Sequence, residues 1–117
     1  MEADMPYNQI LAQRIHAILG GSAGVSEKKM FGGVGFMVHG NMACGVLGDD
    51  LIARVGPELH PVAMAKPFVR PFLSPRGEPM AGWVLVSPEG WQTEEDLLGW
   101  VRQGYEYASS LPAKKKA

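Results

Sequence analysis

The sequence contains a single cysteine, Cys44, among its 117 residues. One thiol cannot form a disulfide within the chain, so the cysteine content gives no indication of an oxidising compartment. The sequence has no apolar run near the length that spans a bilayer, and no charged start followed by an apolar stretch that resembles a secretory leader. We therefore expect a cytoplasmic protein without a membrane segment.

The sequence also lacks the excess of positive charge that nucleic-acid-binding domains usually carry. Three of the 11 basic residues are Lys114, Lys115 and Lys116, so residues 1–113 hold eight basic and 12 acidic residues, a formal charge of −4. Specific binding of nucleic acid is therefore not expected. We expect a single domain over residues 1–113, followed by a flexible basic tail over 114–117.

Closely spaced metal ligands are missing as well. The histidines His16, His39 and His60 and the single Cys44 show none of the close-spaced ligand pairs that a zinc site normally needs. The glycine cluster at 32–35 lacks the Lys-Ser/Thr of a phosphate-binding loop and the spacing of a dinucleotide fingerprint. No metal, cofactor or catalytic residue is therefore predicted, although a site assembled from distant parts of the chain stays open.

What the sequence does contain is the composition of a globular domain, with 46% hydrophobic and 20% charged residues. We expect its organising element to be a β-hairpin within Lys28 to Leu47. Apolar residues at 36–38 and 42–47 flank Gly40-Asn41, which suits a two-residue turn with positive φ at the glycine. The glycines at 32–35 allow a strand to bend or to approach another backbone or a ligand closely.

The other elements follow from periodicity and end signals. Helical spacing predicts a first helix over 7–19 and a last helix after the N-cap Thr93, with Asp96 in a capping-box-like position. A linker is expected over 22–26 and a short helix over 58–66, because Pro61 is tolerated in a first turn. The remaining strands are expected at 51–55, 68–72 and 80–86, and the second is either an edge strand or an irregular one because of its proline.

The expected fold class is α+β. The element order is helix, three strands, helix, two strands, helix. One antiparallel sheet of about five strands, with the N- and C-terminal helices packed largely on one face, accommodates this order in two layers.

Five motifs resemble the N-terminal domain of the TfoX (Sxy) family of bacterial competence regulators. They lie within about residues 8–110 and are, in chain order, Lys29-Met30-Phe31-Gly32-Gly33-x-Gly35, Gly40-x-Met42, Pro67-Phe68, Met80-x-Gly82-Trp83 and Leu97-x-x-Trp100-Val101. The resemblance implies an α-β-β-β-α-β-β-α domain similar to type III secretion chaperones. It implies a regulatory role and no catalytic residue.

Two features depart from the family pattern. Ala43-Cys44-Gly45 stands where relatives often have a bulkier aromatic residue after Met42, which predicts room for a local cavity. Full-length competence regulators have a second, C-terminal domain that this sequence does not show. We therefore expect a stand-alone domain of a regulatory family, without an implied direct role in transcription or DNA uptake.

Two classes of function follow. The first is a non-enzymatic protein-interaction domain that docks a partner or a second copy as a homodimer. It is motivated by the resemblance and by the soft side chains of Met30, Met37, Met42, Met64 and Met80. The hypothetical binding residues, placed around the glycine-rich hairpin, are Lys29, Met30, Phe31, Gly32, Gly33, Gly35, His39, Cys44 and Trp83.

The second class is a small-molecule or catalytic pocket beside the hairpin, with Trp83 as a wall. If Gly40-Asn41 is the turn, His39 pairs with Met42, and Cys44 is a diagonal neighbour about 7–8 Å away. A thiolate paired with an imidazolium is a nucleophile. A small buried cysteine and a histidine at a turn are the simpler reading of the same residues, and we favour it.

Overall fold

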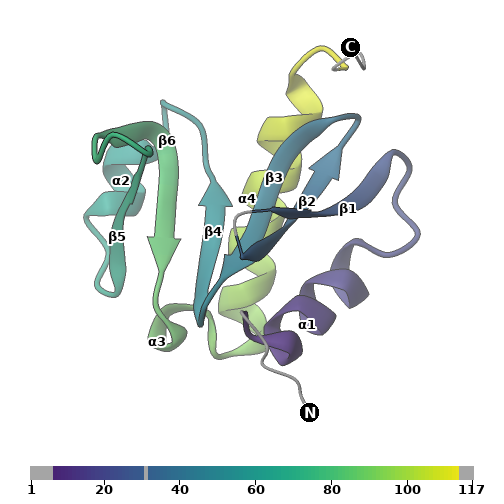
Figure 1. Ribbon diagram of the computed structural model, residues 1–117, viewed down its shortest axis with the longest axis horizontal. Coiled ribbons are helices and arrows are strands. Elements are labelled where there is room, and N and C mark those ends of the chain that lie inside the picture. The colour runs from purple at the N-terminus through teal and green to yellow at the C-terminus, as the bar shows by residue number, and fades with distance from the viewer. Residues whose placement is uncertain (1–6, 31, 114–117) are drawn as a thin grey trace.

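The computed structural model describes residues 7–30 and 32–113, and of Met30 only the backbone. The elements of this part of the chain (Figure 1) are α1 (Gln9–Leu19), β1 (Val25–Met30), β2 (Gly33–Val38), β3 (Asn41–Leu47), β4 (Asp50–Arg54), α2 (His60–Met64), β5 (Val69–Leu73), β6 (Pro79–Val86), α3 (Pro88–Trp91) and α4 (Glu94–Ser110). The strands form one antiparallel sheet in the order β1-β2-β3-β4-β6-β5. The predicted α+β fold is confirmed, with six strands in the described residues where about five were expected.

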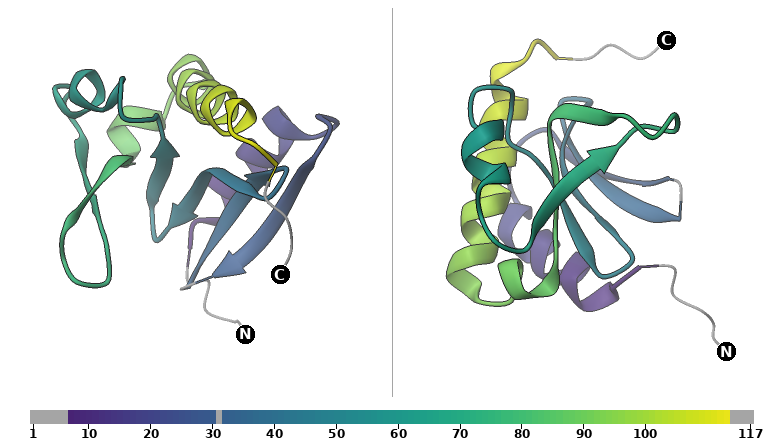
Figure 2. Two further views of the ribbon diagram at one scale, coloured as in Figure 1. Left: turned by 90° about the horizontal axis from the view of Figure 1, so that it is seen from above. Right: turned by 90° about the vertical axis from the view of Figure 1, so that its left-hand side faces the viewer.

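The helices lie on one side of the sheet, which gives the molecule two layers (Figure 2). α4 crosses behind β2, β3 and β4, and α1 packs against α4 and β3. α2 covers β5 and β6. None of the helices in the described part of the chain covers the opposite face of the sheet.

The core lies between the sheet and the helices because strand side chains alternate between the two faces. Leu51 and Ala53 of β4 are fully buried against the helices, whereas Ile52 between them faces the other side. The helices contribute the buried side chains of Leu11, Ile15, Leu97 and Val101. Burial of a large apolar side chain stabilises the fold by about 2 kcal/mol, so this one-sided core holds the two layers together.

Most of the expected elements are confirmed. The first helix is α1, the short helix with Pro61 in its first turn is α2, and the last strand is β6 in the sheet interior. The expected edge strand is β5, whose Pro71 has no N–H to offer to an added strand.

Strand β1 corrects the expected linker over 22–26, because Val25 already begins a strand that pairs with β2. Glu27, Lys28 and Lys29 fill the middle of β1, so it lacks the apolar run that marks a buried strand. Charged residues are tolerated there because β1 is an edge strand. Glu27 contacts His16 of α1, with 2.5 Å between Oε2 and Nδ1.

The turn between β2 and β3 lies one residue earlier than predicted. His39 and Gly40 occupy it with φ values of +51° and +85°, and Val38 pairs with Asn41 across it. Two successive residues with positive φ match the right-handed twist of a hairpin, so the predicted turn at Gly40-Asn41 is wrong by one position.

A bulge in β3 faces α4. The pairing with β2 shifts between Phe36 and Met37, which leaves Ala43 as the extra residue. A Cβ built on Gly104 of α4 would lie 2.2 Å from the carbonyl oxygen of Ala43. Only a residue without a side chain permits this approach, so Gly104 allows the helix to lie close to the sheet.

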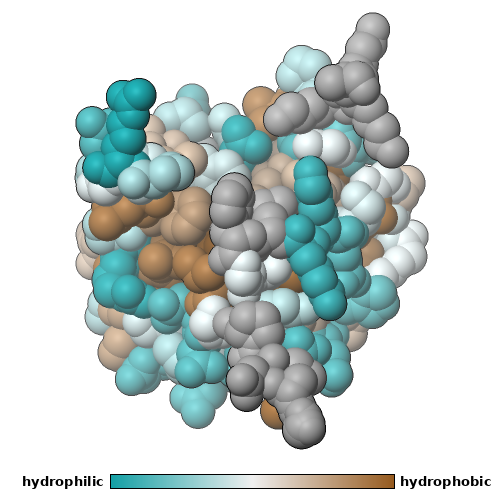
Figure 3. Space-filling view, viewed as in Figure 1, coloured by the Kyte–Doolittle hydropathy of each residue, from teal (hydrophilic) through white to brown (hydrophobic). Residues whose placement is uncertain are grey.

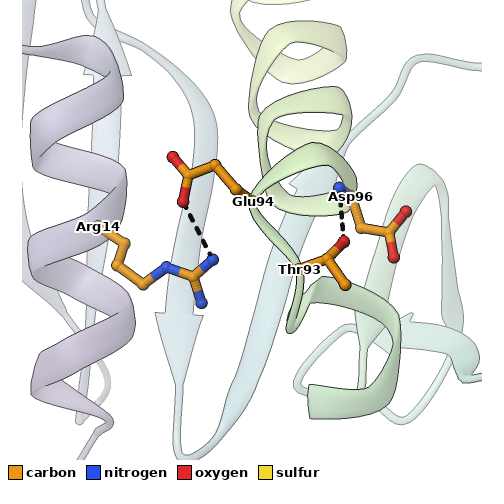
Figure 4. A network of polar contacts seen from close by, with 4 residues as sticks. All are labelled: Arg14, Thr93, Glu94 and Asp96. Atoms are coloured by element: carbon orange, nitrogen blue, oxygen red, sulfur yellow. Dashed lines mark hydrogen bonds and ion pairs between the residues drawn. The ribbon is translucent and has the colours of Figure 1, made fainter.

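Helix α4 begins as predicted. The Oγ1 atom of Thr93 accepts a hydrogen bond from the backbone N–H of Asp96 at 3.1 Å (Figure 4). This contact satisfies an N–H that has no partner within the helix. Glu94 also forms an ion pair with Arg14 of α1, with 3.5 Å between Oε1 and Nη2. The one-turn helix α3 before this cap was not expected, because four residues are too few to show a helical period.

We predict opposite effects for two alanine substitutions in α4. A Cβ at Gly99 meets no atom within 4 Å, so Gly99→Ala should raise the free energy of unfolding by about 0.5–1 kcal/mol through its higher helix propensity. Gly104→Ala should instead lower it by about 2 kcal/mol, because the Cβ collides with the Ala43 backbone. Urea unfolding followed by tryptophan fluorescence measures both. Equal stability of the two variants would show that this contact does not limit the packing of α4.

Candidate functional site

The face of the sheet that no described helix covers, here called the open face, displays alternate residues of each strand (Figure 1). Lys28 of β1 pairs with Gly35 of β2, which in turn pairs with Gly45 of β3. The same row continues across the sheet, where Gly45 pairs with Ile52 of β4 and Ile52 pairs with Leu85 of β6. The open face therefore has a charged edge, a centre made of glycine and an apolar flank.

An apolar groove with a volume of about 400 Å³ lies on the open face. Its walls come from β2, β3, β4 and the hairpin of β5 and β6, and Figure 3 shows hydrophobic surface gathered over β4, β5 and β6. The large side chains that line it include Met42, Ile52, Phe72, Leu73, Met80 and Trp83. A connected apolar surface of this kind commonly marks a contact site.

Gly33 lines the apolar groove, and Gly45 lies beneath Met42, another of its lining residues. A Cβ built on Gly33 would lie 2.3 Å from the carbonyl oxygen of Val46, and one built on Gly45 would lie 2.5 Å from that of Val34. The same Cβ on Gly45 would come within 2.8 Å of Cε of Met42, so this methionine occupies the space above the glycine. This is the close backbone approach for which the glycine cluster is suited.

Trp83 forms a wall of the apolar groove and is contacted from both neighbouring strands. Its ring centroid lies 5.8 Å from that of Phe72 on β5, with the ring planes tilted by 35°. On the other side, the guanidinium carbon of Arg54 on β4 lies 4.8 Å from the Trp83 ring centroid. Leu73, next to Phe72 on β5, lies at the rim of the groove with 49% of its surface exposed. The indole is thus held in place on both sides, while the rim stays open.

Arg54 stands at one end of the apolar groove. Its guanidinium carbon also lies 5.3 Å from the ring centroid of Tyr107 on α4, and its Nη1 atom lies 3.4 Å from the carbonyl oxygen of Met42. A second hollow of about 500 Å³ adjoins Arg54 and shares Met42 and Trp83 with the groove. Two aromatic rings therefore hold the guanidinium in place beside open space.

The opposite end of the open face carries an ion pair. Nη2 of Arg70 on β5 lies 2.6 Å from Oδ2 of Asp50 on β4. Strand β6 runs between these two strands, so the pair spans the sheet near Leu85, the residue that pairs with Arg70. The charge of Asp50 is therefore balanced within the sheet.

The expected pair of His39 and Cys44 does not form. Cys44 is fully buried in the core on the helix side, whereas His39 is exposed at the turn beside Gly24. Because the turn lies one residue earlier, His39 does not pair with Met42. Burial raises the pKa of the Cys44 thiol from 9.0 to about 12, whereas a nucleophile needs a lowered pKa.

Other residues proposed for binding are distributed as follows. Gly33, Gly35 and Trp83 belong to the open face. Gly32 is exposed at the turn between β1 and β2 with a φ of +77°. Phe31, the Met30 side chain and the tail over 114–117 lie outside the described residues.

Lys29 is exposed, but its strand position is that of the helix side, because it pairs with the core residue Val34. Lys28 occupies the position on the open face. Ile52, Phe72 and Leu73 could not be singled out from the sequence, because apolar residues are consecutive at 51–53 and 72–73 instead of alternating with polar ones. Alternation tells which residues share a face, but it does not tell which face the helices leave uncovered.

The described residues contain no group of three or more His, Cys, Asp or Glu side chains arranged to hold a metal ion. Their helices include none that is both long and apolar enough to cross a bilayer.

We predict that Cys44 is unreactive in the folded protein, because it is buried and its thiol pKa is raised. A disulfide reagent should modify it only after unfolding in urea. The thiol pKa of about 12 in the folded protein exceeds the ordinary thiol pKa of 9.0, which applies to the unfolded chain. The free energy of unfolding should therefore be unaffected by this thiol below pH 9 and should decrease as the pH rises toward 12. Cys44→Ala should remove that part of the decrease. Rapid modification of the folded protein would contradict the buried position.

A comparison with protein-family models matches the TfoX N-terminal domain over residues 17–108. This span contains all six strands described above and most of α4. Comparisons with curated proteins and with solved structures gave no significant match. The family model covers most of the chain and agrees with the resemblance of the five motifs. The chain therefore belongs to the family of TfoX N-terminal domains.

Proposed function

We propose that this protein is a non-enzymatic regulatory domain that docks a segment of a partner protein in the apolar groove. The observation that carries the proposal is an uncovered apolar groove on a sheet whose other face already holds the core. Apolar surface left in contact with water is unfavourable, so a groove of this kind is best explained by an occupant. Membership of the TfoX N-terminal domain family supports a regulatory role of the competence-regulator type.

The side chains of the open face suit contacts that adapt to a partner. Met42 and Met80 line the apolar groove, and Met37 lines the adjoining hollow. An unbranched thioether side chain changes rotamer easily, which lets one surface fit different apolar side chains. Met64 instead packs against the core, so only some of the methionines singled out in the sequence support this proposal.

The proposal that the domain is not an enzyme rests on the chemistry of the apolar groove. Among the described residues that line it there is no His, Cys, Asp or Glu. Acid–base catalysis uses such groups within hydrogen-bond reach of a substrate, and the hydroxyl of Ser74, which does line the groove, needs an adjacent base to act as a nucleophile. The alternative pocket around His39 and Cys44 has no support, because one side chain is exposed at a turn and the other is buried in the core.

We further propose that the domain acts in the bacterial cytoplasm.

A second copy of the same chain is the competing occupant of the apolar groove, and it would make the protein a homodimer. The mass of a covalently trapped complex distinguishes a homodimer from a complex with another protein.

We predict that a photo-crosslinking residue, p-benzoylphenylalanine, traps the occupant when it replaces Leu73 in cells of the source bacterium. Leu73 is 49% exposed at the rim of the groove. Ile10 on α1 is 69% exposed and far from the groove in sequence and layer, so it serves as the matched control. We expect a discrete adduct from position 73 and none from position 10.

The adduct should be lost when Met80→Asp places a charge in the apolar groove, provided that urea unfolding shows this variant to be folded. An adduct of twice the chain mass would identify a homodimer. Equal adducts from both positions, or none from position 73, would contradict the proposed docking site.

A further inference from the structure

We infer that the occupant of the apolar groove is an acidic, amphipathic peptide segment whose carboxylate pairs with Arg54 while its apolar side chains fill the groove. This inference rests on the proposed function and specifies the chemistry of the partner. Three observations carry it: the environment of Arg54, the different balance of charge in the two layers, and the contacts of Trp83.

The guanidinium of Arg54 is oriented before any ligand binds. It lies 4.8 Å from the ring centroid of Trp83 and 5.3 Å from that of Tyr107. Its one hydrogen bond within the described residues is the long contact of 3.4 Å to the carbonyl oxygen of Met42. Arginine has five N–H donors in a planar fork that matches a carboxylate, so donors remain for a bidentate contact. Because the rings already restrict the side chain, little further entropy is lost on binding.

Arg54 stands at the boundary between two apolar spaces. Met42 and Trp83 line both the apolar groove and the adjoining hollow, and Arg54 lines the hollow. A segment that lays apolar side chains along the groove therefore brings a neighbouring carboxylate within reach of the guanidinium. Apolar surroundings exclude water, which strengthens an ion pair at this boundary relative to one in open solvent.

The two layers differ in their balance of charge. The described residues of α3, α4 and the loop before α2 carry one basic side chain, Arg102, against six acidic ones, namely Glu58, Glu89, Glu94, Glu95, Asp96 and Glu106. The open face instead carries Lys28 and Arg54, and its Asp50 is paired with Arg70. An acidic segment is therefore attracted to the open face and repelled by the helical layer, which favours one side for docking.

The same surface is poorly suited to single-stranded nucleic acid. Sheets that bind single strands stack bases on free aromatic rings. Trp83 is already contacted by Arg54 from β4 and by Phe72 from β5. Residues 1–113 also carry a formal charge of −4, which opposes binding of a polyanion. Aliphatic side chains with a single carboxylate fit this surface better than bases with many phosphates.

We predict the composition of peptides selected by the full chain from a phage-displayed library of random sequences of about 12 residues, roughly three helical turns. Enriched peptides should combine apolar residues with Asp or Glu. Selection on Arg54→Gln should retain the apolar residues and lose the acidic ones. A synthetic copy of the most enriched peptide should bind Arg54→Gln about tenfold more weakly than the unchanged chain.

Matched variants separate this inference from the proposed function. Arg102→Gln removes an exposed cation from α4 and should bind the peptide like the unchanged chain. Arg54→Lys keeps the charge but not the planar fork, and should bind with intermediate affinity. Urea unfolding shows whether each variant is folded before its binding is compared.

Each outcome of the selection decides one of the two proposals. Some selected peptides could lose binding to Met80→Asp and yet show no preference for Asp or Glu. That result would overturn only the assignment of the carboxylate to Arg54. An acidic preference that persists on Arg54→Gln does the same. Peptides that bind Met80→Asp unchanged, or no enrichment at all, overturn the proposed function as well. Displacement of the peptide by an oligothymidylate of about 12 nucleotides would assign the surface to nucleic acid instead.

Discussion

The close contact between Gly104 and the backbone of Ala43 sets the distance at which α4 lies on the sheet, and much of the architecture depends on it. Ala108, one turn further along the helix, continues the contact by packing with Ala43 and Val38. With α4 this close, the short side chains of β3 are enough to fill the space beneath it. The central strands β2, β3, β4 and β6 then bury core side chains on this face, and α1 completes the layer beside α4. The apolar residues of the other face have no second layer of described helices, so a groove rather than a core forms there.

The elements that could be predicted are those specified by neighbouring residues. Thr93 and Asp96 are three residues apart, and Pro61 and Pro71 act on their own backbone, so the start of α4, the helix α2 and the edge strand β5 were all recognisable. Strand β1 was not recognisable because Glu27, Lys28 and Lys29 fill its middle, so it lacks the apolar pattern of a strand. It is held by pairing with β2 and by the contact of Glu27 with His16, neither of which a local pattern reveals.

The hairpin shows how a small error in a turn changes a predicted site. Both His39-Gly40 and Gly40-Asn41 contain residues that accept positive φ. The backbone N–H of His39 donates to the carbonyl oxygen of Gly24 at 2.9 Å, a contact across to the start of β1 that accompanies the earlier turn. A shift of one residue changes the pairing of every position along a strand, which removes the proposed neighbour relation of His39 and Cys44. Trp83 and the glycines stand out in the sequence by their type, whereas the position of Arg54 depends on Trp83 and Tyr107, which lie far along the chain.

The two edge strands have a consequence for solubility in a crowded cell. A sheet with free edges offers unpaired backbone groups on which other chains can assemble into continuous sheets and fibres. Pro71 interrupts the donors of β5, and the charged run from Glu27 to Lys29 lies along β1. Copies of the domain are thereby hindered from joining edge to edge. An uncovered apolar face therefore stands in a sheet whose two edges each oppose the addition of a further strand.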